Sequence, residues 1–186
     1  MRTEIQKYRD FVHFLAINDE YRVFLNSDNE KAIAVFVELF KKAKECLYIY
    51  AGCLSNDVTN SSEYISSISE FIRNGGEVKV LLNAYNEETA SQSDLLKRLA
   101  YFQAKKKNVI VKKTNEKLFI PSPEGDKEIH FTVVDRKSYR IEIDIVNRKS
   151  ICNMNDTQMG EKLTSLFDPM FDKATPLNLV SFFKMG

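Results

Sequence analysis

Apolar residues recur every three or four positions in five stretches of the chain, with polar residues between them. This spacing places the apolar side chains on one side of a helix, so it predicts five amphipathic helices. Pro169 lies inside the last stretch and is expected to kink that helix or to end it early. The stretches cover residues 5–15, 33–40, 65–72, 95–102 and 159–170.

Residues that start or stop helices flank several of these stretches. An N-cap side chain accepts a hydrogen bond from a backbone N–H of the first turn, and a glycine supplies the left-handed conformation after the last turn. The candidate N-caps are Asp28 or Asn29, Ser91 or Ser93, and Asn155 or Asp156, and the glycine pair is Gly75-Gly76.

Three short runs of β-forming apolar residues alternate with the helices. They cover residues 46–54, 77–82 and 108–111. Nearly continuous apolar runs of this length are typical of strands that are buried on both faces. Because a helix lies between each strand and the next, the connections are long enough to join parallel neighbours.

Two further strand-like runs, residues 128–134 and 139–145, are separated only by residues 135–138. A connection this short cannot cross over a sheet, so the two strands are expected to form an antiparallel hairpin. Together, the elements predict an α/β fold with a mixed, mainly parallel sheet and helices on both faces.

No repeat or change of composition divides the chain, so residues 1–186 are expected to form one domain. Residues 1–29 would be an N-terminal helical extension of this domain. Residues 174–186 would be an apolar C-terminal tail, which either packs back on the core or contacts a partner.

The 186 residues carry a net charge of +1, with 27 Lys and Arg against 26 Asp and Glu. This balance argues against attraction of the whole surface to nucleic acid or anionic lipid. No apolar run reaches the length of a membrane span, and the N-terminus lacks the apolar core of a signal peptide, so a cytoplasmic location is expected. The three cysteines form no C-x-x-C pair and the two histidines are far apart, which argues against a disulfide framework or a metal site. None of the six glycines belongs to a G-x-G-x-x-G or G-K-[ST] phosphate loop, and no cofactor is expected.

The hairpin carries the densest group of polar residues in an apolar setting. Because side chains alternate along a strand, Glu128 and His130 share one face of the first strand. Arg140 and Glu142 share one face of the second. If both polar faces point the same way, the four side chains converge. A histidine beside carboxylates is suited to acid–base or nucleophilic catalysis, and a neighbouring arginine favours a phosphate group. Alternating charges on a hairpin are also typical of a face exposed to water, and that interpretation stays open.

Other polar groups are candidates for anion binding. Asn153 and Asn155 precede the last helix, where backbone N–H groups can hold an anion, although capping by Asn155 or Asp156 explains them as well. Lysine clusters complement helix dipoles, and they would bind nucleic acid only if they lined one groove. The clusters lie at residues 41–44, 105–107 and 112–113.

The order of the elements, together with Ile129-His-Phe-Thr-Val-Val-Asp135 and Tyr139-Arg-Ile-Glu142, resembles one half-unit of the phospholipase D-like phosphodiesterase superfamily. The resemblance covers roughly residues 30–172. In that superfamily each half-unit contributes one H-x-K-x-x-x-x-D motif, and two motifs, from a tandem repeat or a homodimer, form one active site. One histidine attacks phosphorus and the other protonates the leaving group.

The motif departs from the superfamily pattern at several positions. Counting back from Asp135, Glu128 takes the place of the histidine and His130 the place of the lysine. Glu142 and Ile143 take the place of the glycine-serine pair that is expected after the aspartate. The chain is similar to degenerate phospholipase D-like domains of bacterial proteins with the pattern H-F-x-x-x-D, Y-R-x-E and N-x-N-D. Here that pattern reads His130-Phe131, Asp135, Tyr139-Arg140, Glu142 and Asn153-Met-Asn155-Asp156.

Three interpretations remain. In the first, the chain is a non-catalytic phospholipase D-like sensor or assembly module in which Arg140, His130 and Glu142 recognise a phosphate-bearing ligand or a protein partner. In the second, a homodimer cleaves phosphodiesters without a metal, with His130 as nucleophile, Glu142 or Glu128 orienting it and Arg140 holding the phosphate. In the third, the domain is an unrelated α/β fold with a solvated hairpin. The further candidate ligand contacts are Glu128, Asp135, Asn153 and Asn155.

Overall fold

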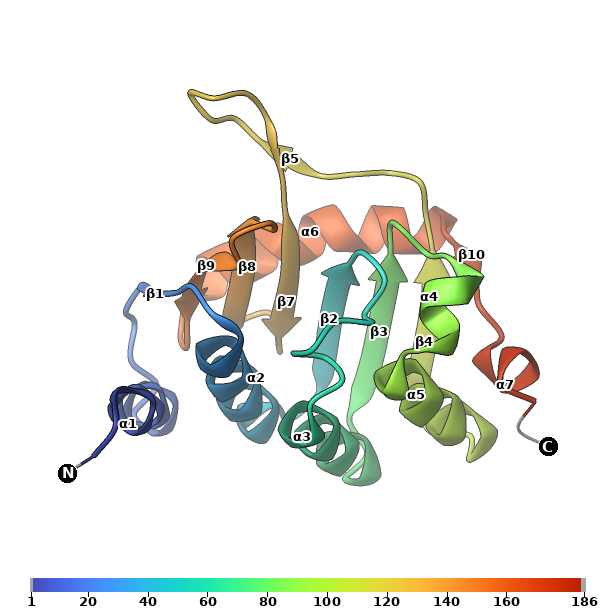
Figure 1. Ribbon diagram of the computed structural model, residues 1–186, viewed down its shortest axis with the longest axis horizontal. Coiled ribbons are helices and arrows are strands. Elements are labelled where there is room, and N and C mark those ends of the chain that lie inside the picture. Colours follow the sequence, from blue (N-terminus) through green and yellow to red (C-terminus); the bar gives the residue numbers. More distant parts are fainter. Residues whose placement is uncertain (1, 185–186) are drawn as a thin grey trace.

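An eight-stranded sheet runs through the computed structural model, which describes residues 2–184 (Figure 1). In sheet order its strands are β1 (Phe24–Asn26), β9 (Lys149–Asn153), β8 (Ser138–Asp144), β7 (His130–Val134), β2 (Cys46–Ala51), β3 (Glu77–Leu82), β4 (Val109–Lys113) and β10 (Thr175–Pro176). The central strands β2, β3 and β4 are parallel neighbours, whereas β7 pairs antiparallel with β2. The sheet is therefore mixed, as predicted, and its parallel part is the centre: among the described strands of this sheet two neighbouring pairs are parallel and five are antiparallel.

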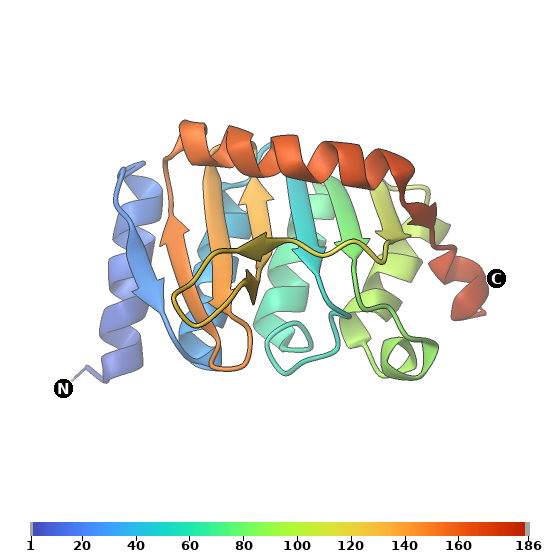
Figure 2. The ribbon, with the colours of Figure 1, turned by 90° about the horizontal axis from the view of Figure 1, so that it is seen from above.

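The helices form one layer on each side of the sheet (Figures 1 and 2). One face is covered by α1 (Glu4–Ile17), α2 (Asn29–Lys42), α3 (Ser62–Arg73) and α5 (Asp94–Ala104). The long helix α6 (Thr157–Lys173) crosses the opposite face (Figure 2). Two short helices, α4 (Glu87–Ser91) and α7 (Leu179–Phe182), complete the described helices. The prediction of an α/β fold with helices on both faces is confirmed.

The caps that the sequence suggested do start the helices. Asp28 accepts a hydrogen bond from the backbone N–H of Lys31 at the start of α2. Ser93 caps α5 and Asp156 caps α6 in the same way. Gly75 follows α3 with a φ of 97°, a conformation that a side chain would strain.

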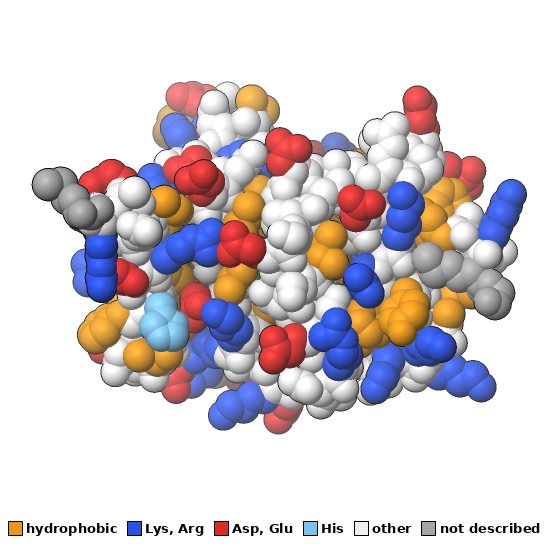
Figure 3. Space-filling view, turned by 60° about the horizontal axis from the view of Figure 1, so that its bottom comes forward, with side chains coloured by type: hydrophobic (Ala, Val, Ile, Leu, Met, Phe, Trp, Pro, Cys, Tyr) orange, Lys and Arg blue, Asp and Glu red, His pale blue; other side chains and the backbone are white. Residues whose placement is uncertain are grey.

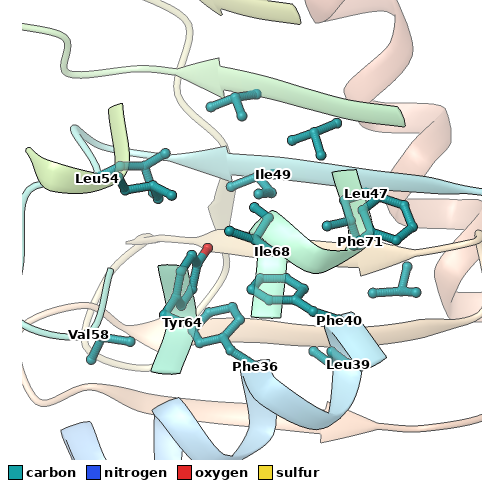
Figure 4. Close-up of a cluster of buried hydrophobic side chains, with 14 of the residues drawn as sticks. Phe36, Leu39, Phe40, Leu47, Ile49, Leu54, Val58, Tyr64, Ile68 and Phe71 are labelled. Atoms are coloured by element: carbon teal, nitrogen blue, oxygen red, sulfur yellow. The ribbon is translucent and has the colours of Figure 1, made fainter. Parts of the chain in front are cut away.

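A core of aromatic and aliphatic side chains fills the space between the sheet and α2 and α3 (Figure 4). The ring of Tyr64 on α3 meets Phe36 and Phe40 of α2 edge to face, each with its centroid 4.9 Å away. A second cluster lies under α6, where the ring of Phe167 packs edge to face on Tyr48 of β2. Because β2 has core on both faces, its side chains are buried almost throughout, as its apolar run predicted.

Several features of the sheet edges and of the C-terminal region differ from the predictions or were missed. The strands β1, β5 (Phe119–Ile120), β9 and β10 and the helices α4 and α7 were not predicted. The predicted strand 128–134 is divided into β6 (Lys127–Glu128), which pairs with β5 in a separate two-stranded sheet, and β7. The helix α6 continues through Pro169 to Lys173, so the prediction of an early end is wrong. Phe167 and Phe171 on either side of the proline both pack in the core, and this packing outweighs the lost backbone hydrogen bond.

The two terminal segments both contact the main body of the fold. Residues 1–29 contribute β1, which pairs with β9 at one edge of the sheet. In the C-terminal tail Leu179 is buried and Phe182 packs against the same core, so the described part of the tail packs back on the molecule. Residues 185–186, which the predicted tail includes, lie outside the described residues. Among residues 2–184 no helix is both long and apolar enough to span a membrane.

Candidate functional site

The candidate site lies where the parallel strands end and the hairpin opens. The strands β2 and β3 have their carboxyl ends at this edge of the sheet, and β7, which is antiparallel to β2, begins there. Across the hairpin His130 pairs with Glu142, and Thr132 pairs with Arg140. Directly paired residues project to the same face of a sheet, so the structure brings His130, Arg140 and Glu142 together.

The imidazole of His130 lies between two carboxylates. Its Nε2 is 3.3 Å from Oε1 of Glu128, and its Nδ1 is 3.8 Å from Oε2 of Glu142. These distances are within ion-pair range, yet Nε2 is buried and has no aligned hydrogen-bond partner among residues 2–184. The His130 side chain is only 15% exposed. The site therefore holds a histidine with unused hydrogen-bonding capacity.

Two arginines share the carboxylate of Glu142. Its Oε1 is 3.4 Å from Nη2 of Arg140 and 3.6 Å from Nη1 of Arg148. Arg140 is fixed by a hydrogen bond from its Nε to Oδ1 of Asn26, and its guanidinium lies 4.9 Å from the ring centroid of Phe36. Burial alone would raise the pKa of Glu142, but His130 and the two arginines hold it below its ordinary value. The carboxylate is therefore ionised at neutral pH, and the two arginines leave one positive charge in excess over it.

These groups line a cavity of about 310 Å³. Its walls are mostly apolar and come from α2, α3, β2 and the loop that follows β2. The backbone of Gly52 lies close to His130 at the cavity wall, since a Cβ at this position would be 3.4 Å from Cε1 of His130. The residues whose side chains form the apolar walls include Phe36, Ile49, Leu54, Val58 and Tyr64. Two charged groups inside such apolar walls interact with each other more strongly than they would in water.

A hydrogen-bond network adjoins the cavity through Glu128. Asn83 donates from Nδ2 to Oε1 of Glu128 and to the hydroxyl of Tyr50, both at 2.8 Å. Lys117 donates to the other oxygen of Glu128 at 2.7 Å. Burial alone would raise the pKa of Glu128, but Lys117 and Asn83 hold it below its ordinary value. The network fixes the carboxylate that faces His130.

The other candidate residues lie elsewhere in the structure. Asp135 is at the opposite end of β7, and its carboxylate accepts three backbone N–H groups at 2.8–2.9 Å. Asn153 is buried and accepts the backbone N–H of Asn155, and Asn155 donates to the backbone carbonyl of Asp19. These side chains satisfy backbone groups, and the cap of α6 is Asp156.

Sequence reasoning missed Arg148 and Asn83. Arg148 lies in the turn between β8 and β9, outside any periodic pattern, so no local signal identifies it. Asn83 had a usable signal, because it is the first polar residue after a buried parallel strand, at the edge where such sheets bind ligands. Among the described residues no group of three or more His, Cys, Asp or Glu side chains is placed to hold a metal ion.

Comparison with known proteins identifies the fold of this chain. No protein-family model and no curated protein sequence matches the chain. Among solved structures, the chain is similar to Nuc from Salmonella typhimurium, a phospholipase D family member, with a TM-score of 0.58 and 10% identity over 85% of this chain and 99% of Nuc. NucT from Helicobacter pylori matches with a TM-score of 0.58 and 13% identity over 85% of this chain and 100% of NucT. The fold is phospholipase D-like.

A third match is with a protein of another kind. TrmBL2, an archaeal chromatin protein with a novel mode of DNA binding, aligns with a TM-score of 0.58 and 13% identity. The alignment covers 92% of this chain and 61% of TrmBL2. The chain thus spans about three fifths of TrmBL2 but nearly all of Nuc and NucT. At these identities the likeness extends to the phospholipase D-like fold alone.

Proposed function

We propose that this phospholipase D-like chain is a binding domain that holds a phosphate-bearing ligand in the cavity beside the β7–β8 hairpin and does not cleave it. The observation that carries the proposal is that Arg140 and Arg148 share one carboxylate, that of Glu142, inside a cavity of about 310 Å³. A guanidinium matches the spacing of two phosphate oxygens, and hydrogen bonds between charged groups are among the strongest that a site can offer.

The two arginines suit different tasks. Arg140 has a side chain that is only 6% exposed and is held by Asn26, Glu142 and Phe36, so it would act as a fixed contact. The Arg148 side chain is 31% exposed, and among residues 2–184 its ion-pair partner is Glu142, at 3.6 Å. It would therefore turn from Glu142 to an incoming phosphate at low cost, and its charge would offset that of the ligand.

The surroundings of His130 favour binding over cleavage. A nucleophilic nitrogen needs an open approach to phosphorus, whereas Nε2 of His130 is buried and faces Glu128 at 3.3 Å. In the position of the superfamily's lysine the chain has His130 itself, and in that of the nucleophile it has Glu128. A phosphorylated segment of a protein would present the same phosphate group, so a protein partner is compatible with this chemistry.

The alternative is a divergent phosphodiesterase, and the pair of carboxylates around His130 favours it. In that case Glu142 or Glu128 would orient the imidazole, and a homodimer would bring two copies of His130 together. Two results are required of this alternative: hydrolysis that His130→Ala abolishes, and a dimer in solution by light scattering.

The test combines binding and turnover on the purified chain. Thermal shift is measured with inorganic phosphate and with phosphate monoesters, and hydrolysis of bis(p-nitrophenyl) phosphate is measured with and without EDTA. The proposal predicts stabilisation by a phosphate compound and no hydrolysis that depends on His130. EDTA-resistant turnover that is lost in His130→Ala would overturn it in favour of the phosphodiesterase.

A further inference from the structure

The charges of this chain are unevenly distributed. Residues 95–115, which include α5 and β4, contain no Asp or Glu. The same segment contains seven basic residues: Lys97, Arg98, Lys105, Lys106, Lys107, Lys112 and Lys113. Since the whole chain has a net charge of only +1, the rest of it is net negative. The segment is thus a strongly basic part of a nearly neutral protein, independent of the cavity beside the hairpin.

The structure separates this cluster from the lysine cluster of α2. In that cluster, Lys41 lies 3.2 Å from Glu38 and Lys42 pairs with Asp19, so two of its three charges are neutralised. Among residues 2–184, none of the four cations Arg98, Lys105, Lys106 and Lys107 has a carboxylate within ion-pair distance, and all four are exposed. Figure 3 shows Lys and Arg side chains gathered around an apolar patch on the side of the α5 helix.

An exposed aromatic ring lies among these cations. Tyr101 is 44% exposed and is three residues after Arg98 and four before Lys105, so the three side chains follow one stripe of α5. The guanidinium of Arg98 is 5.8 Å and Nζ of Lys105 is 5.9 Å from the ring centroid. Over the two turns of this stripe the charges span about 10 Å, so together they can contact more than one phosphate of a nucleic-acid strand.

An anionic membrane and a nucleic acid are the two kinds of polyanion that could bind such a surface, and the structure favours the nucleic acid. A membrane-bound amphipathic helix inserts its apolar side into the lipid, but Leu95, Leu96 and Leu99 of α5 are fully buried in the core. The exposed side of α5 offers cations and one aromatic ring. This combination is suited to a single strand of nucleic acid, in which phosphates bind cations and an unpaired base stacks on an aromatic side chain.

We propose that the surface formed by Arg98, Tyr101 and Lys105–Lys107 binds single-stranded nucleic acid without sequence preference. The lysines and Arg98 contact phosphates, and the ring of Tyr101 stacks on a base. This surface is separate from the cavity of the proposed function, so either proposal stands without the other.

The test measures fluorescence anisotropy of a labelled twenty-nucleotide oligo-dT with the full chain at two salt concentrations. Lys105→Gln/Lys106→Gln/Lys107→Gln is expected to weaken binding about tenfold or more and to reduce the salt slope by about 2. The matched control, Lys41→Gln/Lys42→Gln/Lys44→Gln, removes the same charge from α2 and the turn after it and is expected to change affinity less than twofold. Circular dichroism checks that both variants are folded.

A single substitution separates stacking from charge. Tyr101→Ala is expected to weaken oligo-dT binding about tenfold at an unchanged salt slope, and Tyr101→Phe is expected to keep most of the affinity. Equal loss in the two lysine variants would overturn the proposal, and so would binding that Tyr101→Ala leaves intact. Sedimentation with phosphatidylglycerol vesicles in the absence of oligo-dT binding would overturn it in favour of a membrane surface.

Discussion

The two ends of the β7–β8 hairpin carry similar polar residues but use them differently. At the turn end, the carboxylate of Asp135 accepts the backbone N–H groups of residues 44–46 at 2.8–2.9 Å. At the open end, Glu142 faces Arg140 at 3.4 Å and His130 at 3.8 Å inside a cavity. Nε2 of His130 has no hydrogen-bond partner there among the described residues.

This difference distinguishes polar groups whose hydrogen bonds are used by the backbone from polar groups that are only partly satisfied, within one hairpin. Buried polar groups cost free energy unless they are hydrogen-bonded, so groups whose capacity is used by the backbone hold the fold together. Buried charged groups that lack some of their hydrogen-bond partners destabilise the fold, and a ligand that supplies those partners removes this destabilisation. We therefore infer that the turn end contributes to stability, and the open end is where we propose that the ligand binds.

The largest expected effect is at the turn end. Asp135→Ala removes three hydrogen bonds to a charged acceptor and places alanine at a φ of 50°, so it is expected to lower the free energy of unfolding by about 2–4 kcal/mol. Urea unfolding measures the change. Asp126→Ala, in an exposed loop, is the control and is expected to stay within about 0.5 kcal/mol. A stable Asp135→Ala variant with impaired phosphate binding would reverse the assignment of the two ends.

Two glycines offer a matched comparison of the ends. A Cβ at Gly160 of α6 would lie 2.2 Å from the backbone carbonyl oxygen of Arg136 in the hairpin turn. Gly160→Ala is therefore expected to cost roughly 1–3 kcal/mol of stability, because backbone must move. At the open end a Cβ at Gly52 would only touch His130 at 3.4 Å, so Gly52→Ala is expected to leave the unfolding free energy nearly unchanged and to narrow the cavity. Similar unfolding midpoints for the two variants would argue against the comparison.

A smaller effect concerns pH. The pKa of Glu142 is lowered in the folded chain from its ordinary value of 4.5, so its ionised form stabilises the fold above that pH. This contribution is lost as the pH falls through the lower, folded pKa. The stability advantage of the natural chain over Glu142→Gln is thus expected to be constant near pH 7 and to shrink below pH about 4.5. Chemical unfolding of both proteins from pH 7 to pH 3 measures it, and an advantage that grows on acidification would contradict the ion pair.

Much of the fold could be predicted because its signals are local. The helical periods, the caps Asp28 and Ser93 and the hairpin all depend on residues close together in sequence. The pairing of β1 with β9 joins residues 24–26 to residues 150–152, and no local pattern encodes it. The prediction that α6 ends early at Pro169 was wrong for a related reason, because the packing that keeps α6 helical comes from other elements.

The candidate site divides in the same way. The alternation along each strand predicted that Arg140 and Glu142 share a face, but it left open whether that face also holds His130. The cross-strand register brings the three together. Arg148 joins the site only because the β8–β9 turn places it beside Glu142. The apolar walls come from α2, α3, β2 and the loop after β2, which are distant from the hairpin in sequence. Asp135 could not be separated from the site by sequence, because its amide partners precede it by about ninety residues.

The most direct test of the central claim is an NMR titration of the chain with inorganic phosphate. Arg148→Ala removes the more exposed arginine of the cavity, and Arg73→Ala, at the exposed end of α3, is the matched control. The account predicts shift changes confined to residues around the cavity and an affinity that falls about tenfold in Arg148→Ala but not in Arg73→Ala. Unchanged affinity in Arg148→Ala, or shifts that centre on the turn end of the hairpin, would contradict it.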